Sequence, residues 1–326
     1  MRIHHMWDAY PELQTDISRV LQFIESHIRV RDDTIEAVIR ELMLPGGKLL
    51  RPAYTLLCSK IGPRQTEENA VALAAAIETL HMATLVHDDV IDESVTRRGM
   101  TTLHERFGNK FAIYAGDYLF CLCFSILSRY ASSLIQNGFD FLSMEKILDG
   151  ELAQLHARFQ SQVSVKHYLA RISGKTARLF AIGCYFGALS SEASEKAARA
   201  AWNMGHYIGM AFQIKDDILD YEGEQARVGK PVLHDIRQGI YTLPFIYAMK
   251  EEEERLRPYL ERREQLSDEH AEEVKELIIK AGGIEHAQSV ADRYTSKALA
   301  QLALMPDGDY KQTLKKLTLQ LLRRDT

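Results

Sequence analysis

Two acidic blocks with the same spacing stand out in this sequence, DDVID at 88–92 and DDILD at 216–220. On a helix, the first and fifth residues of each block lie one turn apart on the same face, where they form a carboxylate pair. Two such pairs facing each other would repel strongly unless cations compensate their charge. Magnesium prefers oxygen ligands and takes one or two carboxylates together with substrate phosphates. The spacing therefore predicts metal ions that hold a diphosphate between two helices.

An acidic helix face is often only solvated, so one block alone would carry little weight. Here apolar residues precede each block, over 83–86 and over 208–214. These flanks predict helices that are buried except at the acidic step, and an unpaired acid cluster in that setting is a candidate functional site. The same spacing at two distant positions in the chain argues against coincidence.

Basic residues suited to a diphosphate occur near the first block. The stretch GGKLLRP at 46–52 contributes two cations three residues apart, beside a glycine pair where the backbone can approach a ligand closely. Arg97 and Arg98 follow the first acidic block, and arginine suits bidentate phosphate contacts. His81 lies seven residues before Asp88, which places both on one helical face. Together they predict an anion site beside the acids.

Helical patterns must position these residues. The chain has 8 prolines and none between residues 64 and 230, which favours long helices. Apolar periodicity recurs without a βαβ rhythm, and amphipathic helices are expected from residue 267 onward. The predicted helices before that point cover 67–93, 111–130, 144–160, 166–189, 193–220 and 240–255. We therefore expect one all-α domain over residues 1–326.

Composition limits the function classes. The 326 residues are 46% hydrophobic and 26% charged, as in ordinary globular proteins, and the net charge of -5 argues against nucleic-acid binding. No run of 18 apolar residues and no signal-peptide core is present, so no transmembrane segment is predicted. The four cysteines lie in apolar segments without CxxC spacing and are expected to be buried, which favours a cytoplasmic protein.

These motifs, in this order, resemble the trans-isoprenyl diphosphate synthases (polyprenyl synthetase family) over nearly the whole chain. HMATLVHDDVID at 81–92 and GHYIGMAFQIKDDILDY at 205–221 are most similar to the catalytic subunits of bacterial hexaprenyl and heptaprenyl diphosphate synthases. The resemblance implies a helical bundle of the isoprenoid synthase fold around a central active-site cavity. Its other carriers are GGKLLRP, Glu78-Thr79-Leu80, Arg97-Arg98-Gly99, Gly116-Asp117, Gly174-Lys175-Thr176, Gly229-Lys230-Pro231 and Thr242-Leu243-Pro244.

The resemblance also implies a role for each site residue. The magnesium ligands would be Asp88, Asp92 and Asp216, and the supporting acids Asp89, Asp217 and Asp220. The allylic diphosphate would be bound by Arg97, Lys175 and Lys230. The diphosphate of isopentenyl diphosphate would be bound by Lys48, Arg51, His81 and Arg98. Two polar residues would line the reaction centre near the developing cation and the allylic substrate, Thr176 and Gln213.

The implied reaction joins an allylic diphosphate, expected to be farnesyl diphosphate, to isopentenyl diphosphate with two or three magnesium ions. A medium- or long-chain all-trans product of the C30–C40 class is expected, as in quinone side chains. Two residues depart from the family pattern: Leu49 replaces a usual cation, and Ile240 stands where a lysine is common. The second departure is typical of heteromeric enzymes. The expected assembly is therefore either a homodimer or a heterodimer with a small regulatory subunit.

Product length should depend on the residues four and five positions before the first block. These are Thr84 and Ala83, both small, whereas short-chain synthases often have an aromatic floor at one of them. The floor is then expected deeper, on the following helix, at Phe120, Cys123, Phe124 or Leu127.

Two other functions remain open, and a third is disfavoured. One alternative is a short-chain farnesyl or geranylgeranyl diphosphate synthase, and another is a non-catalytic subunit of a heteromeric synthase. A terpene cyclase is disfavoured, because its second metal block usually has a different pattern.

Overall fold

The structure, a computed structural model, describes residues 3–42, 47–64, 67–97, 99–131, 149, 152, 164–222, 236, 238–262 and 267–322. Helices dominate these residues, and their regular strands form one short hairpin, β1 (Thr96–Arg97) and β2 (Met100–Thr101). The predicted all-α class is confirmed. Contacts divide the chain into two compact units, so a single domain over 1–326 stays a prediction.

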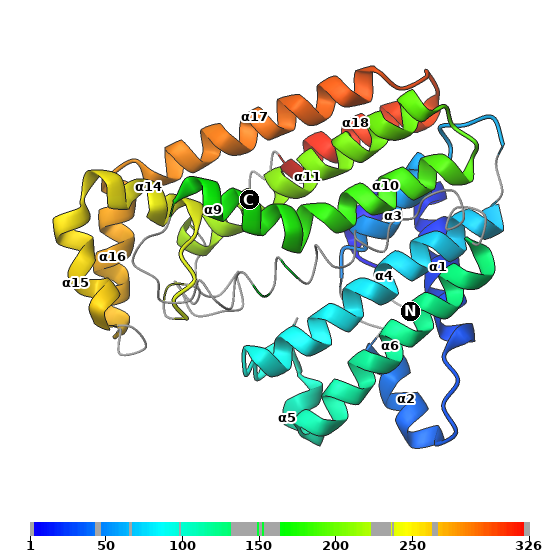
Figure 1. Ribbon diagram of the computed structural model, residues 1–326, viewed down its shortest axis with the longest axis horizontal. Coiled ribbons are helices and arrows are strands. Elements are labelled where there is room, and N and C mark those ends of the chain that lie inside the picture. Colours follow the sequence, from blue (N-terminus) through cyan, green and yellow to red (C-terminus); the bar gives the residue numbers. More distant parts are fainter. Residues whose placement is uncertain are drawn as a thin grey trace. The chain divides into compact units, whose positions relative to one another are not determined.

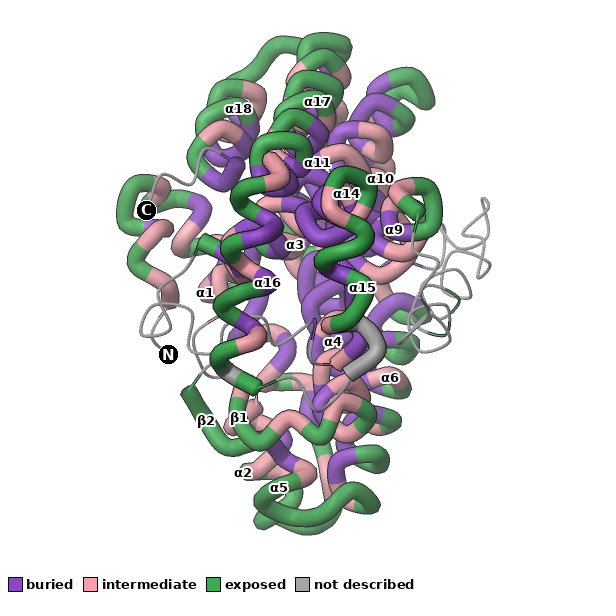
Figure 2. Tube along the Cα trace, turned by 90° about the vertical axis from the view of Figure 1, so that its left-hand side faces the viewer, coloured by how far each residue is buried: buried purple, intermediate pink, exposed green. Residues whose placement is uncertain are grey.

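Unit 1 comprises residues 1–140, 182–202 and 305–314. Its central element is the 25-residue helix α4, whose alanine-rich middle is fully buried, with residues 72–76 at most 1% exposed (Figure 2). Small side chains let neighbouring helices approach it closely. Helix α4 spans Glu67–Ile91, and the other helices of this unit are η1 (His5–Ala9), α1 (Pro11–His27), α2 (Asp33–Leu42), α3 (Leu50–Cys58), α5 (Leu103–Phe107) and α6 (Asn109–Tyr130).

Helices α4 and α6 lie side by side (Figure 1). Gly116 permits this approach, because a Cβ atom there would lie 2.3 Å from Nε2 of His87. The His87 ring also packs against Phe120, with 5.5 Å between ring centroids. The acidic end of α4 is therefore held against α6 by tight packing.

Unit 2 comprises residues 141–181, 203–304 and 315–326, and the boundaries between the units fall within α10, α11 and α18. Its core joins α9, α11, α14, α16 and α17 through buried aliphatic and aromatic side chains. The Thr-Leu-Pro segment begins α14, with Thr242 at the N-cap. The remaining helices are α9 (Val165–Ile172), α10 (Arg178–Ser190), α11 (Glu195–Glu222), α14 (Leu243–Glu251), α15 (Glu253–Arg262), α16 (Asp268–Lys280), α17 (Gly283–Ala303) and α18 (Asp309–Leu322).

Most predicted helices agree with these bounds, and most of the helix predicted at 144–160 lies outside the described residues. The prediction of four buried cysteines was wrong for Cys121, which is exposed on α6, whereas the other three are buried. Burial raises the pKa of the Cys123 thiol to about 12. Cys121 lies within a continuous apolar run, so the sequence pattern did not indicate that its side chain is exposed.

Among the residues that the structure describes, two helices are long and apolar enough to cross a membrane by length and composition. They are α4 and α6, with mean hydropathies of 1.4 and 1.6 over an 18-residue window. The sequence showed no continuous apolar run of that length, because charged and polar residues interrupt both helices. In α4, 72% of that window is buried within the protein, as in a core helix.

Candidate active site

The first acidic block lies at the C-terminal end of α4, in unit 1. The backbone N–H of Asp92 donates to the carbonyl of Asp88 at 2.8 Å, so the helical pattern continues through the block and places Asp88 and Asp92 one turn apart. Both side chains are partly exposed, whereas Asp89 between them is 7% exposed. The first and fifth acids can therefore reach a ligand, and the second belongs to the protein interior.

An ion pair with the partly exposed Arg97 holds the buried Asp89. Arg97, on the β1–β2 hairpin, donates from Nε to Oδ1 of Asp89 at 2.6 Å. Burial raises the pKa of the Asp89 carboxyl, and the Arg97 charge opposes that rise. Gly99 turns the hairpin with a φ of 78°, which favours glycine, and Arg98 lies outside the described residues. Arg97, predicted to bind the allylic diphosphate, here neutralises an acid of its own unit.

Replacing Arg97 with leucine is expected to lower the free energy of unfolding by about 1–3 kcal/mol, because Asp89 would remain buried without its partner. Its pKa would rise further, so the folded state would retain a proton that the unfolded chain releases above about pH 4. Stability should therefore fall as pH rises from about 4 to 7. Chemical denaturation across that range measures the slope. Adding Asp89→Asn should remove the extra pH dependence, and a persistent slope would point to another group.

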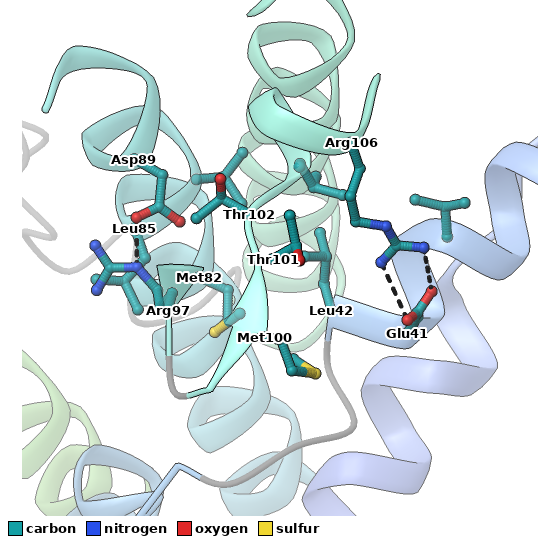
Figure 3. A pocket seen from close by; sticks show the side chains of 13 residues that line it. Glu41, Leu42, Met82, Leu85, Asp89, Arg97, Met100, Thr101, Thr102 and Arg106 are labelled. Carbon is teal, nitrogen blue, oxygen red and sulfur yellow. Dashed lines mark hydrogen bonds and ion pairs between the residues drawn. The ribbon is translucent and has the colours of Figure 1, made fainter. Parts of the chain in front are cut away.

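A small apolar cavity of about 50 Å³ lies behind this ion pair (Figure 3). The Asp89–Arg97 pair borders one side, and the Arg106–Glu41 pair, with two bonds of 3.1 Å, borders another. The apolar lining comes from α2, α4, α5 and the hairpin. Its apolar members are Val38, Leu42, Met82, Leu85, Val86, Met100 and Leu103. The cavity lies on a different face of α4 from Asp88, since residues 82, 85, 86 and 89 form one helical stripe.

The predicted anion site for isopentenyl diphosphate is partly assembled within unit 1. Nη1 of Arg51, on α3, lies 3.1 Å from Nε2 of His81, on α4. Because a guanidinium only donates, the His81 nitrogen accepts and the ring is neutral in this arrangement. The Lys48 carbonyl accepts a bond from the Trp7 indole at 2.9 Å, and Leu49 takes a left-handed φ of 49° before α3 begins. The loop carrying Lys48 is thus fixed through its backbone.

We expect Arg51→Ala to raise the KM for isopentenyl diphosphate about 10- to 100-fold and to change the KM for the allylic substrate much less. One charge-assisted contact to the first substrate would be lost, together with the orientation of His81. Steady-state kinetics with each substrate varied in turn separates the two effects. Arg64→Ala is the control, since Arg64 pairs with Glu192 at 2.8 Å on the surface of the same unit. Equal changes for both substrates would contradict separate anion sites.

The predicted chain-length residues lie on α4 and its neighbour α6. Ala83 is fully buried, Thr84 is partly exposed, and the Thr84 hydroxyl donates to the His81 carbonyl at 2.8 Å. On α6, Cys123 is 1% exposed and Leu127 7% exposed, Phe120 is partly exposed, and Phe124 is 39% exposed. The structure therefore places Thr84, rather than Ala83, on the accessible side of α4.

The second acidic block lies near the C-terminal end of α11, in unit 2, and repeats the burial order of the first. Asp216 is exposed, Asp217 is 5% exposed and Asp220 is partly exposed. Again the second acid is the interior one. Each block thus presents its first and fifth carboxylates, and hard oxygen donors in pairs are the chemistry that suits magnesium beside a diphosphate.

Two side chains donate hydrogen bonds to the Asp217 carboxylate, and a third holds one of these donors in place. Tyr168 on α9 donates to Oδ2 at 2.5 Å, and Gln213 donates from Nε2 to Oδ1 at 2.8 Å. Thr176 donates to Oε1 of Gln213 at 2.7 Å. Burial, together with the Asp217 charge, raises the pKa of the Tyr168 hydroxyl, so it remains a donor. Sequence reasoning singled out Thr176 and Gln213 but missed Tyr168, because a tyrosine within a helical segment gives no signal of its hydrogen-bond partner.

A π-helical turn, Ser173–Ala177, carries Lys175 and Thr176 between α9 and α10. Such wide turns are frequent at functional sites because they redirect side chains. Gly209 lets α11 pack directly on this turn, since a Cβ there would lie 2.5 Å from Cα of Ala177. Lys175 is partly exposed, and Lys230 lies outside the described residues. The turn thus presents a cation and a hydroxyl beside the α11 stripe that carries the second block.

Comparison with known proteins agrees with the chemistry of the two acidic blocks. A family model described as polyprenyl synthetase matches residues 32–278. Heptaprenyl diphosphate synthase component 2 of Geobacillus stearothermophilus is 34% identical over 316 residues, which cover 97% of this chain and 98% of that protein. Magnesium dependence is general in this family.

Two solved structures are similar over nearly their whole length. Geranylgeranyl pyrophosphate synthase from Lactobacillus brevis ATCC 367 has a TM-score of 0.91 and 37% identity, covering 98% of this chain and 99% of that chain. Heptaprenyl diphosphate synthase from Staphylococcus aureus has a TM-score of 0.89 and 36% identity, covering 96% and 99%. The chain therefore belongs to the polyprenyl synthetase family, and it is a prenyltransferase of the trans-polyprenyl diphosphate synthase type.

Proposed function

We propose that this protein condenses isopentenyl diphosphate with an allylic diphosphate, preferably farnesyl diphosphate, and extends it to an all-trans product of the C30–C40 class. A quinone side chain is the proposed use, and the cytoplasm the proposed location. The observation that carries the proposal is the shared design of the two acidic blocks. Each keeps its second aspartate inside its unit and presents the first and fifth carboxylates. A relative named heptaprenyl diphosphate synthase component 2 supports this product class, and one named nonaprenyl diphosphate synthase supports a long-chain product more generally.

In this proposal the charged residues divide between two diphosphates. Arg51 with His81, together with Lys48, hold the isopentenyl diphosphate in position for attack. Lys175 contributes positive charge near the allylic diphosphate, where negative charge develops as the carbon–oxygen bond breaks. Lys230 and Arg98 are proposed for the allylic and isopentenyl diphosphates respectively. Thr176 and Gln213 lie beside the reacting allylic group; Thr176 donates to Gln213, and Gln213 donates to Asp217.

Two or three magnesium ions are proposed as the cofactor, with Asp88, Asp92 and Asp216 as ligands and Asp220 as support. When bound, they supply Lewis-acid stabilisation of the departing diphosphate. The double bond of isopentenyl diphosphate attacks the allylic carbon, and the released diphosphate accepts the proton that is lost. No side-chain nucleophile is needed, so the chain's own contribution is binding, orientation and exclusion of water.

Two observations favour variants of this function. The similarity to a geranylgeranyl pyrophosphate synthase supports a shorter product as the second candidate. The similarity to proteins named component 2 supports a heteromeric enzyme with a small partner subunit, as an alternative to a homodimer.

The test is a product-length assay on the purified protein with magnesium, farnesyl or geranyl diphosphate, and labelled isopentenyl diphosphate. Products are dephosphorylated and sized by chromatography, with and without a candidate partner chain. We expect magnesium-dependent elongation beyond the C20 product. Elongation that stops at C15 or C20 in both conditions would select the short-chain candidate. No condensation in either condition would support a non-catalytic subunit and overturn the proposal.

A further inference from the structure

The second acidic block is anchored differently from the first. Asp89 accepts from a charged partner, Arg97, whereas Asp217 accepts from two neutral donors, the Tyr168 hydroxyl and the Gln213 amide. These two bonds fix the direction of the carboxylate and of the α11 turn that carries Asp216 and Asp220.

The hydrogen-bond directions around Asp217 admit one arrangement. An ionised carboxylate only accepts, so Gln213 must present its NH2 group to Asp217 and its carbonyl to Thr176. The Thr176 hydroxyl must then donate to Gln213, and the Tyr168 hydroxyl to Asp217. The chain of bonds thus links α9, the π-helical turn and α11 in a fixed order.

Tyr168 is also locked in place from its other side. It is 1% exposed, and the guanidinium of Arg171 lies over its ring at 5.3 Å. Arg171 in turn donates to the Tyr241 carbonyl at 3.2 Å. A buried side chain held on both sides orients its hydroxyl without freedom to follow a shift of Asp217.

We propose that Tyr168 is a positioning residue that orients the second acidic block, through Asp217, for binding a divalent cation together with the allylic diphosphate. The inference rests on the proposed function of that block. Partners that orient metal-binding carboxylates typically change metal affinity or activity roughly 10- to 100-fold when removed. Tyr168 touches neither substrate nor metal in this role.

The test is manganese binding to the whole protein, measured by electron paramagnetic resonance in the presence of farnesyl thiolodiphosphate, which resists ionisation. Tyr168→Phe should weaken manganese binding about 10-fold, because phenylalanine keeps the ring and removes one donor. In kinetics, kcat should fall and the half-saturating magnesium concentration should rise, while the KM for isopentenyl diphosphate stays within about 2-fold.

Tyr259→Phe is the matched control. Tyr259 on α15 also donates to a carboxylate, that of Glu273 on α16, at 2.6 Å, and both residues lie outside the acidic blocks in the sequence. It should leave manganese binding unchanged. A double-mutant cycle adds a second readout. When Asp217→Asn is already present, adding Tyr168→Phe should weaken manganese binding further by less than about 2-fold.

Wild-type manganese affinity in Tyr168→Phe, or independent effects in the cycle, would overturn the inference. If Tyr168→Phe does not fold, Thr176→Val must weaken manganese binding about 3-fold through the same chain of bonds; an unchanged affinity overturns the inference equally. Asp216→Asn distinguishes a failure of the proposed function from a failure of the role of Tyr168. If wild-type protein binds no manganese with the thiolodiphosphate, the proposed function fails. If Asp216→Asn weakens binding and Tyr168→Phe does not, the role of Tyr168 alone fails.

Discussion

Replacing Asp88 or Asp216 with alanine is expected to lower turnover about 1,000-fold or more, while the helical fold remains intact. Each carboxylate is proposed to bind magnesium that stabilises the leaving diphosphate, so its loss acts on the transition state. Both side chains lie outside the core, and Asp216 is exposed. The free energy of unfolding of the metal-free protein should therefore change by less than about 0.5 kcal/mol, or rise as like-charge repulsion is relieved.

Initial rates with saturating substrates and a magnesium titration measure the effect, and circular dichroism checks the helices. Asp292→Ala is the control, because Asp292 is also a helical carboxylate of unit 2 and accepts a bond from Gln288 at 2.6 Å. It should keep wild-type turnover. Near-wild-type condensation by either Asp88→Ala or Asp216→Ala would show that the two blocks do not act as the metal site.

Helical periodicity predicted the elements that carry the site. The helix expected at 193–220 is α11, Glu195–Glu222, and the one expected at 67–93 is α4, Glu67–Ile91. The helix expected at 166–189 is interrupted by the π-helical turn at Ser173–Ala177. The sequence did not reveal this turn, because one extra residue in a turn leaves the apolar pattern nearly unchanged. The pattern therefore gave the helices but not the turn that directs Lys175.

The partners of the second aspartates were beyond sequence reasoning. Spacing placed the first and fifth acids of each block on one face and said nothing of what holds the second. Asp89 is held by a hairpin arginine eight residues later, and Asp217 by a tyrosine 49 residues earlier. Such pairings depend on how elements pack, which periodicity does not encode. The grouping of Arg51 with His81 was predicted, since a diphosphate site requires clustered cations and donors.

Product length is expected to depend on Thr84 more cleanly than on Ala83. At 100° per residue, Thr84 lies about 40° from the direction of Asp88 and Ala83 about 140° from it. Ala83 is fully buried, so a phenylalanine there would overpack the interior and cost about 1–3 kcal/mol. The partly exposed Thr84 can accept a larger side chain. Moving each added isoprene unit out of water is favourable, and a bulky residue near the acids takes up the space that the unit would enter.

Thr84→Phe should therefore shorten the product toward farnesyl or geranylgeranyl diphosphate while condensation continues. Ala83→Phe should shorten it as well, with a lower midpoint of thermal unfolding. Chromatographic sizing of dephosphorylated products, alongside thermal unfolding, distinguishes the two variants. Thr84→Val is the control: it loses the hydroxyl bond to the His81 carbonyl, 2.8 Å long, but adds no bulk, and should leave product length unchanged. If Thr84→Phe made the wild-type product, the floor of the chain-length pocket would lie away from this face of α4, and the small residues before Asp88 would have no part in setting the length.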